Sequence, residues 1–413
     1  MADVRPLPGI RYAPESDLAA MVTPPYDVIS PEAQARYYAR DPHNIIRLEL
    51  GREERGDDEL DNRYTRAALT FAEWRLAGVL RQDAPALYLY EQRFITPSAG
   101  GERVRRGLFA RVRIEPWEAG VVLPHERTLS KPKDDRLKLT RATAATLSPI
   151  MSLYDDPKGE LGAVFTKAAR RAPEVAFFDE AAEQHRLWPL RDAATIARVA
   201  KFFRDRQLYI ADGHHRYETA LAYREELRET RRALHPDDPA NFTLMALSAI
   251  EDTGLVVLPT HRIVRGAAPE RLTLLPGELS GYFEMTPLGD PGGLATLDVA
   301  QTLAALEAAG EGGRRVAFVM LTSDGAFLLR QTDGGGAAMD TLDPSRSGEH
   351  AKTSAAWRRL DVAALHELVL ARGLGVNEEA VRAGEYITYT RDAKAAVEAV
   401  RAGDNGAQLA FLL

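Results

Sequence analysis

The sequence predicts an α/β protein of the α+β kind, with mixed sheets and two folded units. Its 413 residues exceed what one hydrophobic core usually supports. Segments with helical spacing of apolar residues alternate with short strand-like runs. Hydrophobic residues make up 45% and charged residues 27%, as in ordinary globular proteins. Gly-rich turns become frequent after residue 265, so we expect a larger region over 1–265 and a smaller C-terminal α+β unit over 266–413.

The spacing of apolar residues places the elements of both regions. Tyr64, Phe71 and Trp74 recur at helical spacing, for example, and a Ser/Gly turn between two apolar runs favours an antiparallel hairpin. Helices are expected over 32–40, 58–77, 163–171, 193–206 and 361–370. Strands are expected over 86–94, 107–114, 174–178, 208–211, 241–249, 255–258, 316–321 and 326–329, with a loop over 259–262.

Composition excludes several classes of protein. The net charge of -7 argues against a nucleic-acid binder with a broad basic face. The absence of cysteine excludes disulfides, thiolate zinc sites and thiol nucleophiles, and it fits a reducing cytoplasm. No window approaches the roughly 18 continuous apolar residues of a membrane span, and the amino terminus has no apolar core of the signal-peptide type. We therefore expect a cytoplasmic protein without nucleic-acid or membrane partners, whose oligomeric state the sequence does not indicate.

The segment over 208–227 carries the main candidate site. An apolar strand runs into Asp212 and Gly213, and a helix follows. Backbone N–H groups at the first turn of a helix lack partners and lie at the positive end of its dipole, so an anion binds there readily. His214, His215 and Arg216 would add donors, and Gly213 allows close approach of a ligand. This pattern predicts a phosphate site, although a simple helix cap with solvated histidines would produce it as well.

A carboxylate beside a phosphate site would repel the phosphate. Asp212 is therefore expected to act as a magnesium ligand or as the base that accepts a hydroxyl proton. The polar motif PHERT over 124–128 adds His125 and Glu126 as candidate catalytic residues and Thr128 as a substrate contact, and Arg136 follows as a further phosphate contact. A solvated loop with local ion pairs is the alternative for this segment.

Other polar side chains lie where loops or strand ends would present them to a cavity. Tyr26 and Asp27 follow two prolines that fix a rigid turn, and Arg47 precedes an alternating run. His261 and Arg262 are expected to follow the end of a strand, a frequent place for ligand contacts. These five residues are expected to bind the substrate. The remaining histidines have no partner at ligand spacing and are expected to be incidental: His185, His235, His350 and His366.

Several motifs together resemble the bacterial and archaeal family DUF1015. They are PPYDVI (24–29), PHNIIRLEL (42–50), PHERT, ADGHHRYETAL (211–221), PTHR (259–262) and YITYT (386–390). Within them, DGHHR is similar to the signature of the ParB and sulfiredoxin superfamily, in which a Gly-x-[His/Arg]-Arg turn at a helix start holds nucleotide phosphates. That superfamily includes free-serine kinases, sulfiredoxins and CTP-binding partition proteins.

The resemblance implies a nucleotide-dependent phosphotransferase acting on a small hydroxylated metabolite such as serine. Its cofactors would be Mg²⁺ and a nucleoside di- or triphosphate such as ADP or ATP. By motif, residues 213–216 would contact phosphates, and Asp212 would be the magnesium ligand or the base. The family pattern continues past an AFLL-like strand into a Lys-, Ser- and Tyr-rich motif, whereas this sequence stops at Leu413. If that motif closes the site, this chain lacks the closure.

Two other functions stay open. One is a metal-dependent hydrolase or phosphatase, with Zn²⁺ or Mn²⁺ held by His125, Asp212, His214 and His215, although the spacing HExxH is absent. The other is a nucleotide-binding protein that holds phosphates without transferring them.

Overall fold

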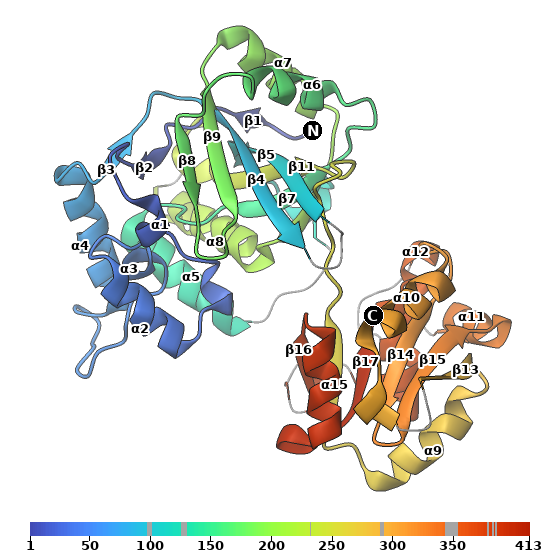
Figure 1. Cartoon of the computed structure of the whole chain (residues 1–413). Helices are drawn as coiled ribbons and strands as arrows, with labels where there is room; N and C mark the ends of the chain where they lie inside the picture. Colours follow the sequence, from blue (N-terminus) through green and yellow to red (C-terminus); the bar gives the residue numbers. More distant parts are fainter. Residues whose placement is uncertain are drawn as a thin grey trace. The chain divides into compact units, whose positions relative to one another are not determined.

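The chain folds into two compact units, Met1–Val256 and Val257–Leu413 (Figure 1). The computed structural model describes residues 1–96, 101–124, 130–231, 233–289, 293–342, 354–377, 380–381, 384 and 386–413. The α+β class is confirmed. The division falls before Gly266, because strand β12 (His261–Arg265) pairs with β16 (Ile387–Thr390) and β17 (Ala407–Leu412) of the second unit. Within the described ranges, none of the helices combines the length and apolar character needed to cross a bilayer.

A nine-stranded mixed sheet forms the centre of the first unit. Its strand order is β6-β10-β7-β11-β5-β4-β9-β8, with β1 also paired to β5. The pairs β6/β10 and β7/β11 are parallel and the others are antiparallel, including the predicted β4/β5 hairpin. The strands are β1 (Val4–Arg5), β4 (Leu87–Thr96), β5 (Gly101–Arg113), β6 (Val122–Leu123), β7 (Ile150–Tyr154), β8 (Val175–Phe178), β9 (Gln184–Leu190), β10 (Leu208–Asp212) and β11 (Phe242–Ala249).

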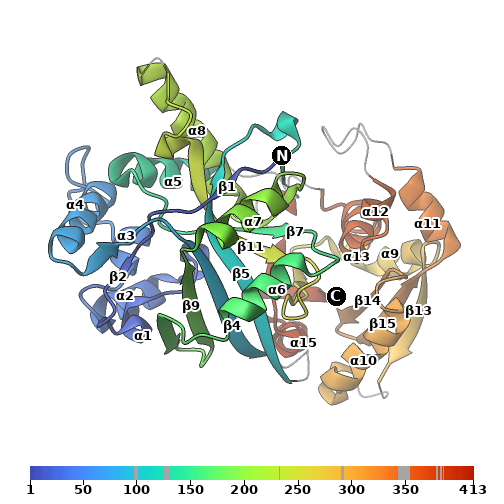
Figure 2. The same cartoon turned by 90° about the horizontal axis from the view of Figure 1, so that it is seen from above.

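The two faces of this sheet differ in character. Leu87 and Leu89 of β4 join the main hydrophobic core, to which the helices α6 (Glu160–Ala168) and α7 (Ala193–Phe203) contribute their apolar sides. Figure 2 shows these two helices next to each other at the sheet. Side chains alternate between the faces of a strand, so Tyr90 and the other even-numbered residues of β4 lie on the opposite face. That face carries the cavity described below.

The remaining helices of the first unit form a connected group beside the sheet. Contacts link α2 to α3, α3 to α4, α4 to α5 and α5 to α8. Leu48, Phe71, Trp74 and Leu80 form a smaller buried cluster within this group. The elements are α1 (Leu18–Met21), α2 (Pro31–Arg40), α3 (Ile46–Glu49), α4 (Arg63–Leu76), α5 (Ser130–Thr143) and α8 (His214–Arg231), with the small sheet of β2 (Ile10–Tyr12) and β3 (Leu80–Gln82).

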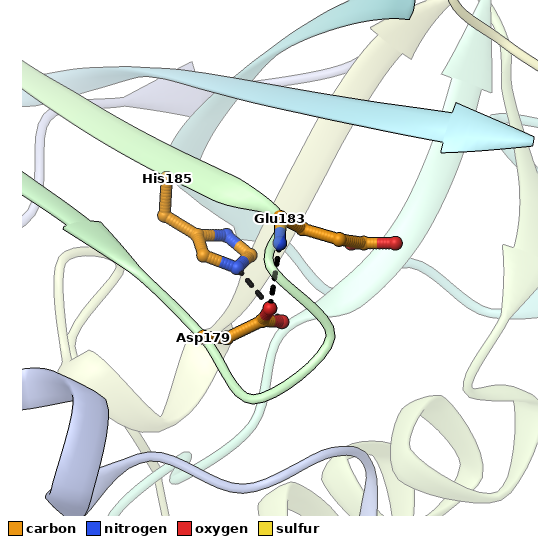
Figure 3. Close-up of side chains that lie close together, drawn as sticks. All are labelled: Asp179, Glu183 and His185. Carbon is orange, nitrogen blue, oxygen red and sulfur yellow. Dashed lines mark hydrogen bonds and ion pairs between the residues drawn. The ribbon is translucent and has the colours of Figure 1, made fainter.

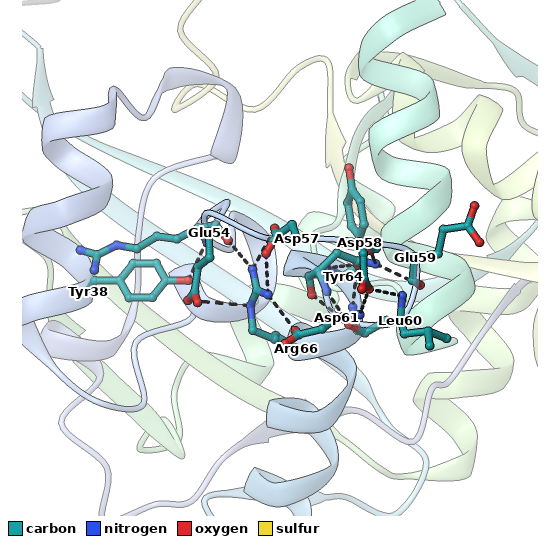
Figure 4. A network of polar contacts seen from close by, with 12 residues as sticks. Tyr38, Glu54, Asp57, Asp58, Glu59, Leu60, Asp61, Tyr64 and Arg66 are labelled. Carbon is teal, nitrogen blue, oxygen red and sulfur yellow. Dashed lines mark hydrogen bonds and ion pairs between the residues drawn. The ribbon is translucent and has the colours of Figure 1, made fainter.

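Helix α4 begins later than its predicted start at Asp58. Asn62 caps the helix, because its side chain accepts the backbone N–H of Thr65 while the Thr65 hydroxyl accepts the N–H of Asn62. The acidic segment before the cap folds back onto the helix, where Arg66 binds Asp57 at 2.8 Å (Figure 4). The charged residues ahead of the cap therefore form an ordered loop instead of a first helical turn.

The second unit is built on a six-stranded antiparallel sheet of order β13-β15-β14-β17-β12-β16. Separate hydrophobic clusters cover its faces, one with α9 and the π-helical segment η6, the other with α10 and α15. The predicted strand pair is confirmed as β14 and β15, and the strand predicted over 255–258 is wrong, because the strand begins at His261. The other elements are α9 (Pro269–Leu279), β13 (Phe283–Leu288), α10 (Val299–Gly310), β14 (Ala317–Thr322), β15 (Gly325–Gln331), α11 (Asp333–Asp340), α12 (Ala355–Arg358), α13 (Asp361–Ala364), η6 (Leu365–Gly373) and α15 (Ala393–Ala402).

A buried carboxylate ties three strands of the first unit together. The Glu91 side chain on β4 is fully buried. Its carboxylate forms ion pairs with Arg106 at 2.8 Å and with Arg93 and Arg186 at 3.0 Å each. Burial by itself would raise the pKa of this carboxyl, but the hydrogen bonds and charges of Arg106 and Arg93 outweigh it and hold the pKa below its usual range. The charged form of Glu91 therefore stabilises the sheet.

We expect Glu91→Gln to lower the free energy of unfolding by about 2 kcal/mol at pH 7, because three arginines lose their shared countercharge. The arginines are 24–33% exposed, which keeps the loss below that of a fully buried pair. A lowered folded pKa contributes stability above the unfolded pKa and loses it as pH falls, so the difference should shrink in acid. Urea unfolding from pH 7 to pH 4 measures it. Glu398→Gln, which removes an exposed pair with Arg401, should cost less than about 0.5 kcal/mol.

Candidate functional site

A cavity of about 470 Å³ opens in the first unit. Its lining comes from the sheet face opposite the main core, the loop over 22–26, the segment over 147–149 and the turn between β10 and α8, together with Tyr12 of β2 and with Ile45 and Glu49 at α3. Its polar lining includes Thr23, Tyr26, Glu49, Tyr90, Gln92, Arg105, Ser148, Asp212, Arg216 and Ser248. The cavity volume lies within the range of roughly 300–1,000 Å³ typical of small-molecule sites.

A β-bulge directs Asp212 into this cavity. On the neighbouring strand β7, Ile210 lies opposite Ser152 but Asp212 lies opposite Met151, so Ala211 is the extra residue. Ile210 is part of the buried core, and in a regular strand a residue two positions later would face the same side. The bulge reverses that orientation, and both Asp212 and Met151 line the cavity.

Gly213 and Arg216 complete the turn. Gly213 has φ of +96°, and a Cβ there would lie 2.9 Å from Nε of Arg216. The guanidinium of Arg216 binds the Asp212 carboxylate and the carbonyl of Pro149. The N–H of Tyr217 donates to the Gly213 carbonyl at 3.0 Å, which begins α8. The predicted strand, turn and helix are thus confirmed, and Asp212 and Arg216 meet at the cavity wall as an ion pair.

We expect Gly213→Ala to destabilise the first unit by about 2 kcal/mol, because the residue combines a positive φ with a close contact to Arg216. The matched control is Gly162→Ala in α6, where a Cβ meets no atom within 4 Å and φ is not positive. That control should raise stability by about 0.5–1 kcal/mol. Urea unfolding of the wild type and of both variants measures these differences in the free energy of unfolding. Equal stability of Gly213→Ala and the wild type would contradict the tight turn.

The two histidines of the motif do not line the cavity. His214 is buried, with 2% of its surface exposed, and His215 is partly buried. Neither is among the residues that form the cavity wall, although both were expected to contact phosphates. Among the described residues, Asp212, His214 and His215 do not gather into a group of three metal ligands. Of the four residues of the motif that were expected to contact phosphates, only Arg216 lines the cavity, because Gly213 is not among the lining residues either.

Arg136 binds two carboxylates of the protein itself. Its guanidinium is buried and donates to Asp135 at 2.8 Å, to the Glu49 carbonyl at 2.9 Å and to the Glu49 carboxylate at 3.3 Å. It also lies 4.0 Å from the centre of the Tyr26 ring, and the Ser148 hydroxyl donates to Glu49 at 2.6 Å. Burial would raise the pKa of Asp135, but the charge of Arg136 outweighs it and the pKa is lowered. Arg136 thus positions Tyr26 and Glu49 at the cavity wall, in place of the predicted phosphate contact.

Two further predicted residues of the first unit lie away from the cavity wall. Asp27 follows Tyr26 but is not among the lining residues. Arg47 donates to the Tyr38 carbonyl at 3.0 Å and lies 4.6 Å from the centre of the Tyr38 ring. Three predicted residues, His125, Glu126 and Thr128, lie outside the part of the chain that the structure describes.

His261 and Arg262 belong to the second unit, whereas every residue that lines the cavity comes from the first. His261 is buried in β12, where its Nδ1 accepts the backbone N–H of Leu413 at 3.2 Å. Burial and the neighbouring Arg262 lower the pKa of His261. Arg262 lies 5.6 Å from the centre of the Tyr389 ring. Both side chains are therefore part of the sheet of the second unit.

Three residues that the sequence reasoning missed form another part of the cavity wall: Tyr90, Gln92 and Arg105. Arg105 of β5 lies opposite Gln92 of β4 and donates to its side-chain carbonyl. Within the described ranges, the other side-chain contact of the Arg105 guanidinium is with the sulfur of Met151, and none of its contacts is with a carboxylate. The guanidinium of Arg105 is thus a partly buried positive charge at the cavity that no carboxylate of the described residues neutralises. The signal in the sequence was the alternation in 87–92, where Tyr90 and Gln92 form the polar side.

Comparison with known proteins places this chain in a family. No curated protein matches it. One solved structure, a conserved hypothetical protein from Pyrococcus furiosus, is 12% identical, with 74% of this chain and 78% of that chain covered and a TM-score of 0.29. The family model described as "Protein of unknown function (DUF1015)" matches residues 4–363. The chain therefore belongs to the DUF1015 family.

Proposed function

We propose that the first unit is a nucleotide-dependent phosphotransferase that acts on a small hydroxylated metabolite. This proposal rests on the set of charged side chains that line one cavity. It contains a carboxylate and a guanidinium at the start of a helix, Asp212 and Arg216, together with Arg105, which has no carboxylate partner among the described residues. Phosphoryl transfer requires positive charge around the phosphates and a carboxylate for a cation or a proton.

Each group has a distinct part in this proposal. The amides at the start of α8 and the planar guanidinium of Arg216 suit phosphate oxygens. Mg²⁺ is usually held by one or two carboxylates together with substrate phosphates and water. The cavity is lined by two carboxylates, Asp212 and Glu49, and Glu49 already accepts hydrogen bonds from Arg136 and Ser148, so Asp212 is the one that fits that cation. Bound there, Mg²⁺ would neutralise charge on the transferred group. A cation on Asp212 would also compete with its ion pair, which leaves Arg216 available to the phosphates.

The similarity of DGHHR to the phosphate-binding turn of the ParB and sulfiredoxin superfamily supports a nucleotide as the donor. A cavity of about 470 Å³ is sufficient for a small acceptor and the phosphates of a nucleotide. The free-serine kinases of that superfamily make a hydroxy amino acid the first acceptor to test.

The test is to incubate the full chain with Mg²⁺, a panel of nucleoside di- and triphosphates and pooled hydroxy amino acids, and to follow phosphorus by NMR. A new phosphomonoester signal that requires both nucleotide and acceptor supports the proposal. Release of phosphate from phosphoesters with Zn²⁺ or Mn²⁺ and without nucleotide would identify a hydrolase instead. Tight nucleotide binding without any product would identify a nucleotide-binding protein, and either result overturns the transferase.

A further inference from the structure

A chain of three polar side chains leads from the turn between β8 and β9 to the cavity. Asp179 lies 3.1 Å from Nε2 of His185, and Nδ1 of His185 lies 2.6 Å from the hydroxyl of Tyr90. Figure 3 shows the His185 ring directed at the Asp179 carboxylate. Tyr90 lines the cavity. His185, which the sequence indicated to be incidental, therefore connects a carboxylate to the hydroxyl of a residue that lines the cavity.

The geometry determines which atoms carry the protons. A carboxylate accepts hydrogen bonds, so Nε2 of His185 must carry the hydrogen that points at Asp179. In the neutral ring Nδ1 then has a lone pair and accepts the hydroxyl proton of Tyr90. The ring stacks on Phe177, at a centroid distance of 4.8 Å and an interplanar angle of 23°, and the Tyr90 ring lies nearly parallel to it at 6.0 Å and 17°. The lone pairs of the Tyr90 oxygen are left to accept a proton from a ligand.

Glu183 completes a group whose ligand atoms lie within 4.8 Å of one another, as in a metal site. Its carboxylate, however, accepts a hydrogen bond from Gln92, and its backbone N–H donates to Asp179 at 2.9 Å. Both ring nitrogens of His185 are also engaged. These contacts account for the group without a metal, and they favour proton transfer over cation binding.

We propose that Tyr90 is the proton-accepting residue of the cavity and that it works as a relay with His185 and Asp179. The oxygen of Tyr90 takes the proton of an incoming hydroxyl group while the proton of Tyr90 passes to Nδ1 of His185. The resulting imidazolium is neutralised by Asp179. The deprotonated acceptor oxygen then forms its bond to the phosphorus of the nucleotide's terminal phosphate, and the bond from that phosphorus to the leaving nucleotide oxygen breaks. This use in phosphoryl transfer rests on the function proposed above, whereas the relay itself does not.

The relay also explains how a neutral phenol could serve as a base. Burial raises the pKa of Tyr90, Arg105 opposes that shift, and Glu183 and Asp179 add to it. Tyr90 therefore remains protonated at neutral pH and needs an acceptor for its own proton. His185 is the acceptor for that proton. Asp212 is then left to bind the cation, and Tyr90 takes the proton of the ligand.

Covalent labelling tests the relay without any turnover. A small sulfonyl fluoride such as phenylmethylsulfonyl fluoride reacts with an activated tyrosine: the oxygen bonds to sulfur, fluoride leaves and the phenolic proton passes to the base. Mass spectrometry then gives the labelling rate of each tyrosine. We expect Tyr90 to be labelled about 10-fold faster than Tyr26 of the same cavity. His185→Gln should slow the labelling of Tyr90 by roughly 100-fold, which is the lower end of the rate enhancements typical of general-base catalysis. His235→Gln, far along the sequence in an exposed turn, should not change it.

Labelling of Tyr90 that is no faster than that of Tyr26, or that His185→Gln leaves unchanged, overturns the relay. Asp179→Asn provides a second variant if His185→Gln does not fold by circular dichroism, and it should slow labelling in the same direction. If phosphorus NMR shows no transfer while Tyr90 is labelled in a His185-dependent way, the proposed function fails and the relay stands. If transfer occurs, Tyr90→Phe should lower kcat by roughly 100-fold with little change in KM.

Discussion

The Asp212→Asn protein is expected to transfer phosphate roughly 100-fold to 1,000-fold more slowly than the wild type while its stability stays almost unchanged. The Asp212 side chain is 54% exposed, so the loss of its charge costs little folding energy. An amide binds Mg²⁺ more weakly than a carboxylate because it has no net charge. The steady-state rate as a function of Mg²⁺ concentration measures the effect, and high Mg²⁺ should restore part of the activity.

The matched control is Asp205→Asn, which removes an exposed carboxylate of the same unit outside the cavity lining. Its rate should equal that of the wild type. Nucleotide binding separates the roles further. Without Mg²⁺, Asp212→Asn should bind the nucleotide at least as tightly as the wild type, because Arg216 no longer has its intramolecular partner. An Asp212→Asn protein with the full rate at low Mg²⁺ would exclude this residue as the cation ligand.

The local structure around this residue could be read from the sequence, but its orientation could not. The apolar run before Asp212, then Gly213 and a helix-forming segment, specify strand, turn and helix through short-range preferences. The bulge that turns Asp212 toward the cavity depends on pairing with Met151, some sixty positions earlier. Pairing between distant segments is decided by the packing of the whole sheet, and a single sequence does not display it.

Strand β9 and its histidine were missed for a related reason. Its residues Gln184, His185 and Arg186 are polar, and Pro189 argues against a strand in the interior of a sheet. The structure tolerates the proline because β8 pairs with β9 only as far as Leu187, so the position of Pro189 lies beyond the end of β8. His185 and Arg186 find side-chain partners on β4, Tyr90 and Glu91, which only the folded sheet supplies.

For Arg136 the prediction was wrong in a different way. The residue was expected to bind the phosphates of a ligand, but it binds carboxylates of the protein itself. Its charge and its position after the PHERT motif suggested a phosphate contact, yet it is buried between Glu49 and Asp135. Composition alone does not distinguish an arginine that faces a ligand from one that neutralises buried carboxylates. The distinction has a large energetic consequence, because the cost of breaking a buried ion pair exceeds that of an exposed one.

We therefore expect Arg136→Met to lower the free energy of unfolding by about 3–4 kcal/mol, in the range for removal of one partner of a buried ion pair. The side chains of Arg136 and Glu49 are 8% and 9% exposed, so solvent does little to stabilise the carboxylate left behind. Asp135 keeps Arg63 at 2.6 Å, which limits the loss to the side of Glu49. Urea unfolding measures the change, and Arg401→Met at an exposed pair should cost less than about 0.5 kcal/mol.

The double variant Glu49→Met/Arg136→Met separates buried charge from lost packing. Replacing both partners of a buried pair by apolar side chains of similar size is often neutral, so the double variant should be more stable than Arg136→Met alone. It should still lose affinity for a cavity ligand, because the Tyr26 ring loses the guanidinium 4.0 Å away and Ser148 loses its acceptor. If instead the double variant is less stable than either single variant, the pair acts mainly through packing. The wall formed by Tyr26 and Ser148 would then not depend on the charge of Arg136.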